Sequence, residues 1–550
     1  MKMKIKMKTK MKTKIETKIE TKIETKIETK TEAGAHRGRG AGRPGAPETR
    51  GMPETLGMHG LLGRLRMSGA PRMPGRPGKT AKAGRAGFCV AALLLCCALG
   101  LFACDGGGAT APARQASGSA YAAPAAAVQA PEDLPAGDEI LRIYCWNTEF
   151  QDRFNAYYLE SLPAALRIEW VITPNDGNAY QNRLDADLAG NADADDPIDI
   201  FLIEADYAMK YVDTAYTLDV VGDVGLSEAD LADQYDYTKR IATDSGGRLK
   251  AVSWQATPGL FAYRRSIAKD VLGTDDPEQV QALLSDWEKF DAVAARMSEK
   301  GYRMLSGFDD AYRVFSNNVE RPWVDASNRI VIDDNLMRWV EQTKRYTELG
   351  YHNGTRLWDA AWSADQGPGG MVFGFFYSTW GINFTLLENA LADPSAAQAV
   401  GNGIFGDYAV CEGPQHYYWG GTWICAAAGG DNVDTVREVM HALACDAEIM
   451  QRMTRDTEDY ANNRAAMDAI AGDPEYGSAL LGGQNHIALF ADAAPLIDMR
   501  NAGPYDQGLN ESFQAAMVEY FAGEASLDAA LRNFRADAAR KYPDLAAGSG

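Results

Sequence analysis

The stretch ILRIYCWN (residues 140–147), followed by IEWVIT (168–173) and IDIFLI (198–203), decides the fold. Each is a short run of β-branched, aromatic and other apolar residues, which is typical of a buried strand. Two helical patterns separate the runs: residues 150–162, and a segment in which Tyr180, Leu184 and Leu188 recur every four positions. Strands that alternate with helices at this spacing predict an α/β fold whose parallel sheet is covered by helices.

The same alternation continues toward the C-terminus. Further apolar runs predict strands at Leu249–Trp254, Gly259–Tyr263 and Met371–Tyr377. Helical spacing predicts helices at 276–297, at 434–453, at 511–521, at 527–540, and from an N-cap at Asp334 to a closing glycine at Gly350. In parallel sheets of this kind, ligands lie beyond the carboxyl ends of the strands.

Charge is distributed very unevenly along the 550 residues, of which 46% are apolar. The formal net charge is −20, but residues 1–103 hold 22 Lys and Arg against 7 Asp and Glu, which leaves −35 for the remainder. A surface this acidic repels nucleic acid, so we expect no nucleic-acid partner, and it favours a soluble monomer.

The first 137 residues predict a leader and a tether. Residues 1–80 are low-complexity and we expect them to be disordered; residues 81–103 form a signal peptide, with a basic flank before an apolar run. The end of that run, Leu101-Phe102-Ala103-Cys104, resembles the lipobox of bacterial lipoproteins, which implies lipidation of Cys104. An ordinary signal peptide or an uncleaved anchor remains the alternative. Residues 104–137 are expected to be a flexible tether, and translation is expected to start at Met67 or Met73.

Four cysteines follow the tether: Cys145, Cys411, Cys425 and Cys445. Their spacing contains no Cys-x-x-Cys pair, and each lies in an apolar segment, so we interpret them as small core residues although an exported compartment would permit disulfides. The four histidines after residue 138 show no metal-binding spacing. We therefore expect neither a metal nor a cofactor.

Three segments carry a family resemblance: PGLFAYRR (258–265), GFFYSTW (374–380) and WGGTWI (419–424). In this order, with the lipobox before them, they resemble the extracellular solute-binding proteins of bacterial carbohydrate ABC importers. The resemblance covers roughly residues 138–545. It implies a receptor on the extracytoplasmic face of the cell membrane, which captures a sugar or oligosaccharide and delivers it to membrane permease subunits without catalysing a reaction.

The family fold implied by this resemblance has two α/β lobes joined by crossing hinge strands, each lobe with a mostly parallel sheet flanked by helices. On that basis we assign residues 138–252 and 415–456 to lobe one, and residues 262–408 and 463–545 to lobe two. The ligand is expected in the cleft between them, with closure of the lobes as the working motion.

Aromatic side chains are the first class of candidate ligand-binding residues, because sugars present apolar C–H faces. All eleven tryptophans follow residue 138. Those at strand ends, at the hinge or beside glycines are favoured for stacking, whereas Trp170 and Trp339 lie inside regular elements and are expected to pack in the core. The candidates are Trp146, Trp254, Trp362, Trp380, Trp419 and Trp423.

Polar candidates follow the same topology, since carboxylates and amides can bind sugar hydroxyls. Each of them could equally be a surface carboxylate or a helix cap. The candidates are Asn147 and Glu149 after the first strand, Glu204 and Asp206 after the third, Gln255 at the hinge, and Asp310 and Asp365 in loops of lobe two.

Two other classes of function remain open. Paired carboxylates such as Glu149 and Glu204 could hydrolyse glycosides, and Cys145 could be the nucleophile of a thiaminase-like transferase on the same fold. Alternatively, the chain could be a receptor for a non-sugar solute, such as a peptide or a cationic metabolite.

Overall fold

The computed structural model describes residues 139–545, and its first part is built on a five-stranded sheet in the order β2-β1-β3-β10-β4. The predicted strands form as expected, and β1, β2 and β3 run parallel, with Tyr144 of β1 paired to Val171 of β2. Strand β10 enters from much later in the chain and pairs antiparallel with both β3 and β4. The strands are β1 (Glu139–Cys145), β2 (Leu166–Ile172), β3 (Ile200–Glu204), β4 (Val252–Ser253) and β10 (Thr422–Ala426).

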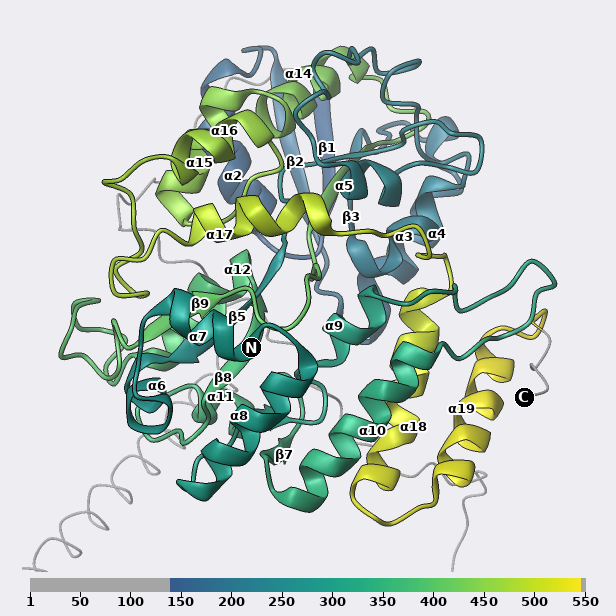
Figure 1. Cartoon of the computed structure of the whole chain (residues 1–550). Helices are drawn as coiled ribbons and strands as arrows, with labels where there is room; N and C mark the ends of the chain where they lie inside the picture. The colour runs from purple at the N-terminus through teal and green to yellow at the C-terminus, as the bar shows by residue number, and fades with distance from the viewer. Residues whose placement is uncertain (1–138, 546–550) are drawn as a thin grey trace, which may run out of the picture. The chain divides into compact units, whose positions relative to one another are not determined.

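Helices cover this sheet and complete what we call lobe one. Alternate residues of β1, among them Leu141 and Ile143, are fully buried beneath them. Helix α2 packs against both α14 and α15, which come from nearly 300 residues further along the chain (Figure 1). The helices of this part are α2 (Glu149–Tyr157), α3 (Ala179–Leu188), α4 (Ala208–Val212), α5 (Asp236–Ile241), α14 (Val433–Ala444) and α15 (Ala447–Thr457).

Lobe two surrounds a three-stranded sheet in the order β8-β5-β9. Both pairings in this sheet are antiparallel, and among the described strands parallel pairing in this lobe is confined to β6 with β7. The mostly parallel sheet expected for each lobe thus holds for lobe one only, because β5 enters directly from lobe one and not through a helical crossover. The strands are β5 (Gly259–Arg264), β6 (Leu305–Gly307), β7 (His352–Thr355), β8 (Gly374–Ser378) and β9 (Tyr408–Cys411).

Aromatic packing joins the sheet of lobe two to its helices. The Phe261 ring of β5 lies 5.2 Å from Phe290 and 4.9 Å from Phe376, all three buried. Helices α10, α18 and α19 lie side by side below (Figure 1). The helices are α6 (Arg265–Leu272), α7 (Pro277–Leu284), α8 (Trp287–Glu299), α9 (Tyr312–Asn317), α10 (Asp334–Leu349), α11 (Ala360–Asp365), α12 (Thr379–Gly381), α13 (Leu387–Ala390), α18 (Asp506–Phe521) and α19 (Leu527–Lys541).

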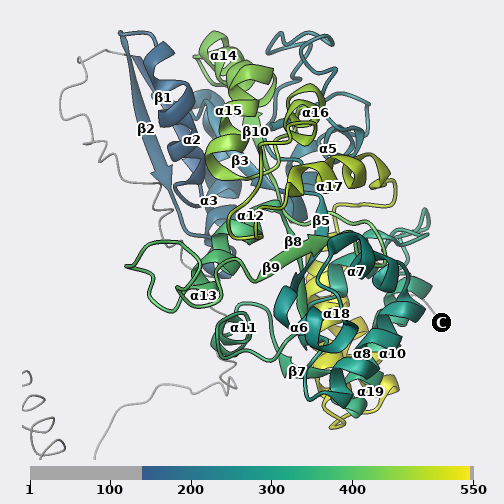
Figure 2. The same ribbon diagram turned by 60° about the vertical axis from the view of Figure 1, so that its left-hand side comes forward.

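The chain passes between the lobes three times. The first two passages run from β4 to β5 and from β9 to β10. The third comes later than the expected boundary near residue 460, because α16 (Arg464–Ala471) packs on α15 of lobe one and α17 (His486–Ala493) packs on α16 (Figure 2). Asn463 holds this segment to lobe one through a hydrogen bond from its side-chain amide to the Cys445 carbonyl.

Three predicted helix limits differ from the structure. Helix α10 is capped by Asp333 and not by Asp334, because the Asp333 carboxylate accepts the backbone N–H of Asn335. At its other end Gly350 closes the helix in the left-handed conformation, as predicted. The helix expected at 434–453 is two helices, because Asp446 caps a new one by accepting the amides of Glu448 and Ile449. Likewise, Asp286 caps α8 and splits the stretch 276–297.

The predicted leader (1–80), signal peptide (81–103), tether (104–137), lipidated Cys104 and start at Met67 or Met73 lie outside the described residues. Within residues 139–545, no helix has both the length and the apolar character needed to cross a membrane.

Candidate functional site

The carboxyl ends of β1 and β3 bring five of the predicted residues to one edge of the lobe-one sheet. Trp146 and Asn147 directly follow β1 and Glu149 opens α2, while Glu204 ends β3 and Asp206 lies in the short helix after it. The Trp146 ring is half-buried and packs edge-on against Tyr180, with 5.5 Å between ring centroids. The structure therefore places these strand-end residues on the side of lobe one that the topology predicts.

An ion pair between the two lobes lies at this edge. Both terminal nitrogens of the Arg313 guanidinium, on α9 of lobe two, donate to the two carboxylate oxygens of Asp206 in lobe one. The guanidinium carbon also lies 5.9 Å from the centre of the Trp419 ring. Asp206 was predicted as a site residue, whereas Arg313 was not, because nothing in its local sequence shows which lobe-one carboxylate it meets.

Glu204 lies beside this ion pair, but no positively charged side chain within residues 139–545 makes a hydrogen bond to its carboxylate. Its carboxylate accepts the backbone N–H of Asp206 at 2.8 Å. Burial and the negative charge of Asp206 raise the pKa of Glu204 to about 8, an effect that the Arg313 charge only partly opposes. Burial deprives this carboxyl group of hydrogen bonds from water. A ligand hydroxyl that donates to it would supply the missing hydrogen bond.

A second polar chain links Glu149 to the hinge. The Gln255 side-chain amide donates to Glu149 at 2.9 Å and to Asp459 at 2.7 Å, and Asp459 accepts the hydroxyl of Thr379 from lobe two. Burial raises the pKa of Glu149 to about 7, with Arg153 acting in the opposite direction. Asp459 is a further residue that sequence reasoning missed.

Four tryptophans form a cluster in lobe two and at the second hinge passage, which we call the tryptophan cluster: Trp358, Trp362, Trp380 and Trp419. The Trp380 ring lies 5.2 Å from Trp419 and its indole N–H donates to the Trp419 carbonyl at 2.9 Å. Gly420 has a positive φ of 76°, and a Cβ there would lie 2.9 Å from the Trp380 nitrogen, so a glycine is required where the two meet. Trp358 was not predicted, although it lies only four residues before Trp362.

Trp254 and Trp423, in contrast, do not stand free of the core as expected. Each is only 1% exposed. Trp254 stacks on Phe150 with 5.3 Å between ring centroids, and the Trp423 indole N–H donates to the Thr238 carbonyl. Trp254 directly follows β4 and Trp423 lies in β10, and both rings fill the interior of lobe one. Of the two expected to pack, Trp339 is fully buried and Trp170 half-buried against the core.

Asp310 and Asp365 organise lobe two locally. Asp310 is 6% exposed and accepts the backbone N–H groups of Ser306 and Gly307 and the indole N–H of Trp362. Asp365 accepts the Ser306 hydroxyl and the Asn353 amide. Trp362, 1% exposed, is therefore a buried member of the tryptophan cluster, held by its hydrogen bond to Asp310.

The four described cysteines are buried, as the apolar segments predict, and they form no disulfide with one another. Burial raises the pKa of the Cys145 thiol to about 12, so the thiolate that a nucleophile requires is scarce at neutral pH. This weakens the transferase alternative.

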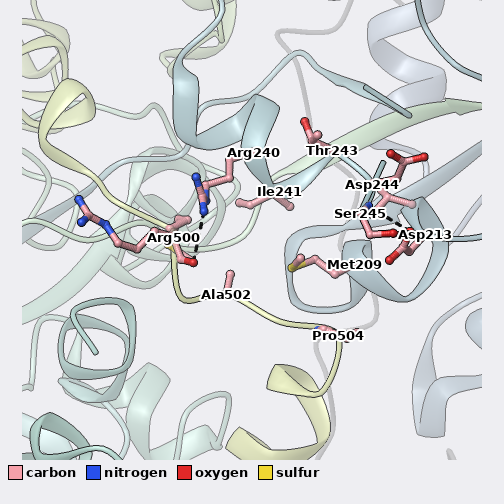
Figure 3. A pocket seen from close by; sticks show the side chains of 12 residues that line it. Met209, Asp213, Arg240, Ile241, Thr243, Asp244, Ser245, Arg500, Ala502 and Pro504 are labelled. Atoms are coloured by element: carbon pink, nitrogen blue, oxygen red, sulfur yellow. Dashed lines mark hydrogen bonds between the residues drawn. The ribbon is translucent and has the colours of Figure 1, made fainter. Parts of the chain in front are cut away.

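A hollow of about 350 Å³ lies at the edge of lobe one, between α4, α5 and the 499–504 segment that leads into α18 (Figure 3). Its charged groups are largely engaged within the protein: Asp213 accepts from Ser245, and Arg500 pairs with Asp498. Arg240 donates to the Arg500 carbonyl across the hollow, at 3.4 Å. None of the predicted site residues lines it.

Two α/β lobes joined by three passages, with polar and aromatic side chains meeting between them, define a periplasmic-binding-protein-like fold. Residues 158–477 match the family model described as bacterial extracellular solute-binding protein. This is more than half of the chain, and the chain belongs to that family. Its members are extracytoplasmic binding proteins of transport systems, in line with the predicted class.

Solved structures share the fold at low sequence identity. An extracellular solute-binding protein of family 1 has a TM-score of 0.61 and 17% identity, over 73% of this chain and 99% of that one. The lacto-N-biose complex of the galacto-N-biose/lacto-N-biose I-binding protein from Bifidobacterium longum gives 0.56 and 12%, over 76% and 100%. The sugar-binding protein MalE from Xanthomonas citri gives 0.56 and 14%, over 73% and 98%. No curated protein sequence matches the chain.

Proposed function

We propose that this protein is a lipid-anchored receptor that captures a sugar or oligosaccharide between its lobes and delivers it to the permease subunits of an ABC importer. The observation that carries the proposal is the tryptophan cluster at the hinge, with half-buried rings at Trp358 and Trp380, on the lobe whose Arg313 pairs with Asp206 of lobe one. Aromatic faces for C–H groups and carboxylates for hydroxyls are the two elements that a sugar site needs.

The residues proposed to contact the ligand follow β1 and β3 or belong to the hinge and the tryptophan cluster. From lobe one they are Trp146, Asn147, Glu149, Glu204 and Asp206, and from the hinge and lobe two they are Gln255, Trp380 and Trp419. Trp254, Trp362, Trp423, Asp310 and Asp365 are assigned a supporting role, because each packs or bonds within its own lobe. Gln255 and Trp419 are also buried, but they are kept as contacts because Gln255 donates to Glu149 and Trp419 lies beside Arg313.

A thermal-shift screen of the purified protein against saccharides, polyols, amino acids, short peptides and thiamin tests the ligand class. A saccharide at a hundredfold excess over its Kd should stabilise the fold by about 2.7 kcal/mol. A shift by peptides or cationic metabolites alone would overturn the carbohydrate assignment. Conversion of the saccharide to a product would overturn the receptor in favour of a glycoside hydrolase.

Matched tryptophan variants test the location of the site. Trp380→Ala should weaken saccharide binding more than tenfold in isothermal titration. Trp170→Ala, which removes a half-buried ring that packs on Phe154 of α2 and lies outside the tryptophan cluster, should leave the Kd within about threefold. Equal effects of the two variants would contradict the proposed site.

Lipid anchoring is tested separately in cells that express the chain. Radiolabelled palmitate should be incorporated into the wild-type protein and not into Cys104→Ala. Absence of label on the wild type would remove the anchor from the proposal without affecting the binding function.

A further inference from the structure

The loop between β7 and α11 holds Trp358 in an unusual backbone conformation. Its φ is +71°, in the left-handed region that bulky residues rarely adopt. Such a conformation costs free energy and persists only where the surroundings fix it, which occurs most often at ligand sites.

Two adjacent carboxylates hold the loop on either side of Trp358. Asp309, 4% exposed, accepts the Arg356 side-chain N–H at 2.5 Å and lies 3.4 Å from the Leu357 amide. Asp310 accepts the indole N–H of Trp362 at 3.0 Å. Because residues 356, 357 and 362 are all anchored to one short segment, the loop has little freedom to relax the backbone of Trp358.

The Trp358 ring faces the other members of the tryptophan cluster. It lies 6.0 Å from Trp380, with only 21° between the ring planes, and 6.1 Å from Trp419. A sugar ring held between two parallel aromatic faces needs roughly 7–8 Å, that is, two van der Waals contacts of about 3.5–4.0 Å each. Rotation of the half-buried Trp358 side chain away from Trp380, with the backbone still held by the loop, would open such a slot between the two rings.

We infer that Trp358 is a specificity-determining residue of the sugar site, which closes this slot on one ring of the ligand, and that Asp309 is a positioning residue that sets it through Arg356. The inference rests on the proposed function. A slot with two flat walls accepts a pyranose whose faces carry no axial hydroxyl, and it disfavours an epimer with an axial hydroxyl against either wall.

The test compares Trp358→Leu with Trp287→Leu, because Trp287 is also half-buried in lobe two but stacks on Phe315, outside the cluster. Cellobiose and lactose, which differ in one axial hydroxyl on the terminal ring, are titrated into each variant and the wild type. We expect Trp358→Leu to weaken cellobiose binding at least tenfold and to reduce the preference for cellobiose over lactose, with Trp287→Leu within about threefold of the wild type.

The outcomes separate this inference from the proposed function. If the wild type binds a saccharide and Trp358→Leu keeps both its affinity and its preference, the inference falls and the receptor stands. If the wild type binds no saccharide in the wider screen, both fall. A wild-type preference for lactose over cellobiose would overturn the flat-slot assignment.

The positioning role has its own readout. Asp309→Asn should alter the near-ultraviolet circular dichroism of the coupled indoles and weaken binding, and Asp309→Glu should restore part of both by re-forming the ion pair with Arg356. An unchanged near-ultraviolet spectrum in Asp309→Asn would contradict the role, and would do so even in a variant too unstable for titration.

Discussion

Burial decides what each tryptophan of this chain does. Trp254 follows β4 at the first hinge passage and Trp380 follows β8, yet Trp254 is 1% exposed and stacked on Phe150 while Trp380 is half-buried in the tryptophan cluster. Removing a buried indole leaves a cavity in a packed core, whereas removing a half-buried one exposes surface that water can reach.

Trp254→Ala is accordingly expected to lower the free energy of unfolding by about 3–5 kcal/mol, through lost burial and an unfilled cavity. Urea unfolding followed by far-ultraviolet circular dichroism measures it. Trp380→Ala should cost clearly less in the same assay. A smaller loss for Trp254→Ala than for Trp380→Ala would mean that Trp254 is not a core residue.

Glu204 gives stability a specific pH dependence. Burial raises its pKa to about 8, well above the ordinary value of 4.5. Between these pH values the unfolded chain releases the proton while the folded protein keeps it, so the unfolded state binds fewer protons and this group makes stability fall as the pH rises. Glu204→Gln should flatten that fall between about pH 5 and 8, measured as unfolding free energy at a series of pH values. An unchanged slope would contradict the shifted pKa.

At the scale of elements, short polar side chains fix the helix limits that periodicity leaves open. Apolar spacing runs through 434–453, but Asp446 can accept two amide N–H groups and therefore starts a new helix. Similarly, Asp333 and Asp334 are both acceptable caps by sequence, and only the folded geometry selects Asp333. Strands β1, β2 and β3 were predictable because β-branched runs of this length have few alternatives.

The first hinge passage depends on a glycine. A Cβ on Gly259, where β5 begins, would lie 2.2 Å from the Tyr417 ring, so β5 and the second passage could not both keep their positions. Gly259→Ala should destabilise the protein by about 1–3 kcal/mol, measured by thermal unfolding and urea titration.

Gly190→Ala is the matched control for this substitution. A Cβ there meets nothing within 4 Å and φ is −112°, so the change should stay within about 0.5 kcal/mol. If Gly259→Ala is tolerated equally well, the close packing of the two passages is not needed for stability.

At the scale of the whole molecule, the Asp206–Arg313 ion pair connects the lobes directly. Arg313→Gln removes it and leaves the Asp206 carboxylate uncompensated, so the lobes should separate more readily and the radius of gyration of the ligand-free protein should rise in small-angle X-ray scattering. Lys300→Gln is the control, because Lys300 pairs with Asp270 within lobe two. No difference between the two variants would show that the interlobe pair does not hold the lobes together.

The sequence predicts the site residues that follow strands, and it misses those whose partners are distant along the chain. Glu149, Glu204 and Asp206 were predictable because the ends of parallel strands meet at one edge of a sheet. Arg313, Asp459 and Trp358 were not, because their partners lie about 20 to 200 positions away in the sequence and only tertiary contacts, within lobe two or between the lobes, bring them together. The sequence position of the third passage could not be predicted for the same reason, since α16 is held to lobe one by tertiary contacts.

The most direct test of the receptor is equilibrium dialysis of the purified protein with radiolabelled saccharides, followed by chromatography of the bound label. The account predicts one saccharide bound per chain, recovered chemically unchanged, and displaced by unlabelled saccharide but not by amino acids or peptides. Absence of any bound saccharide across mono-, di- and oligosaccharides, or recovery of a cleaved product, would contradict it.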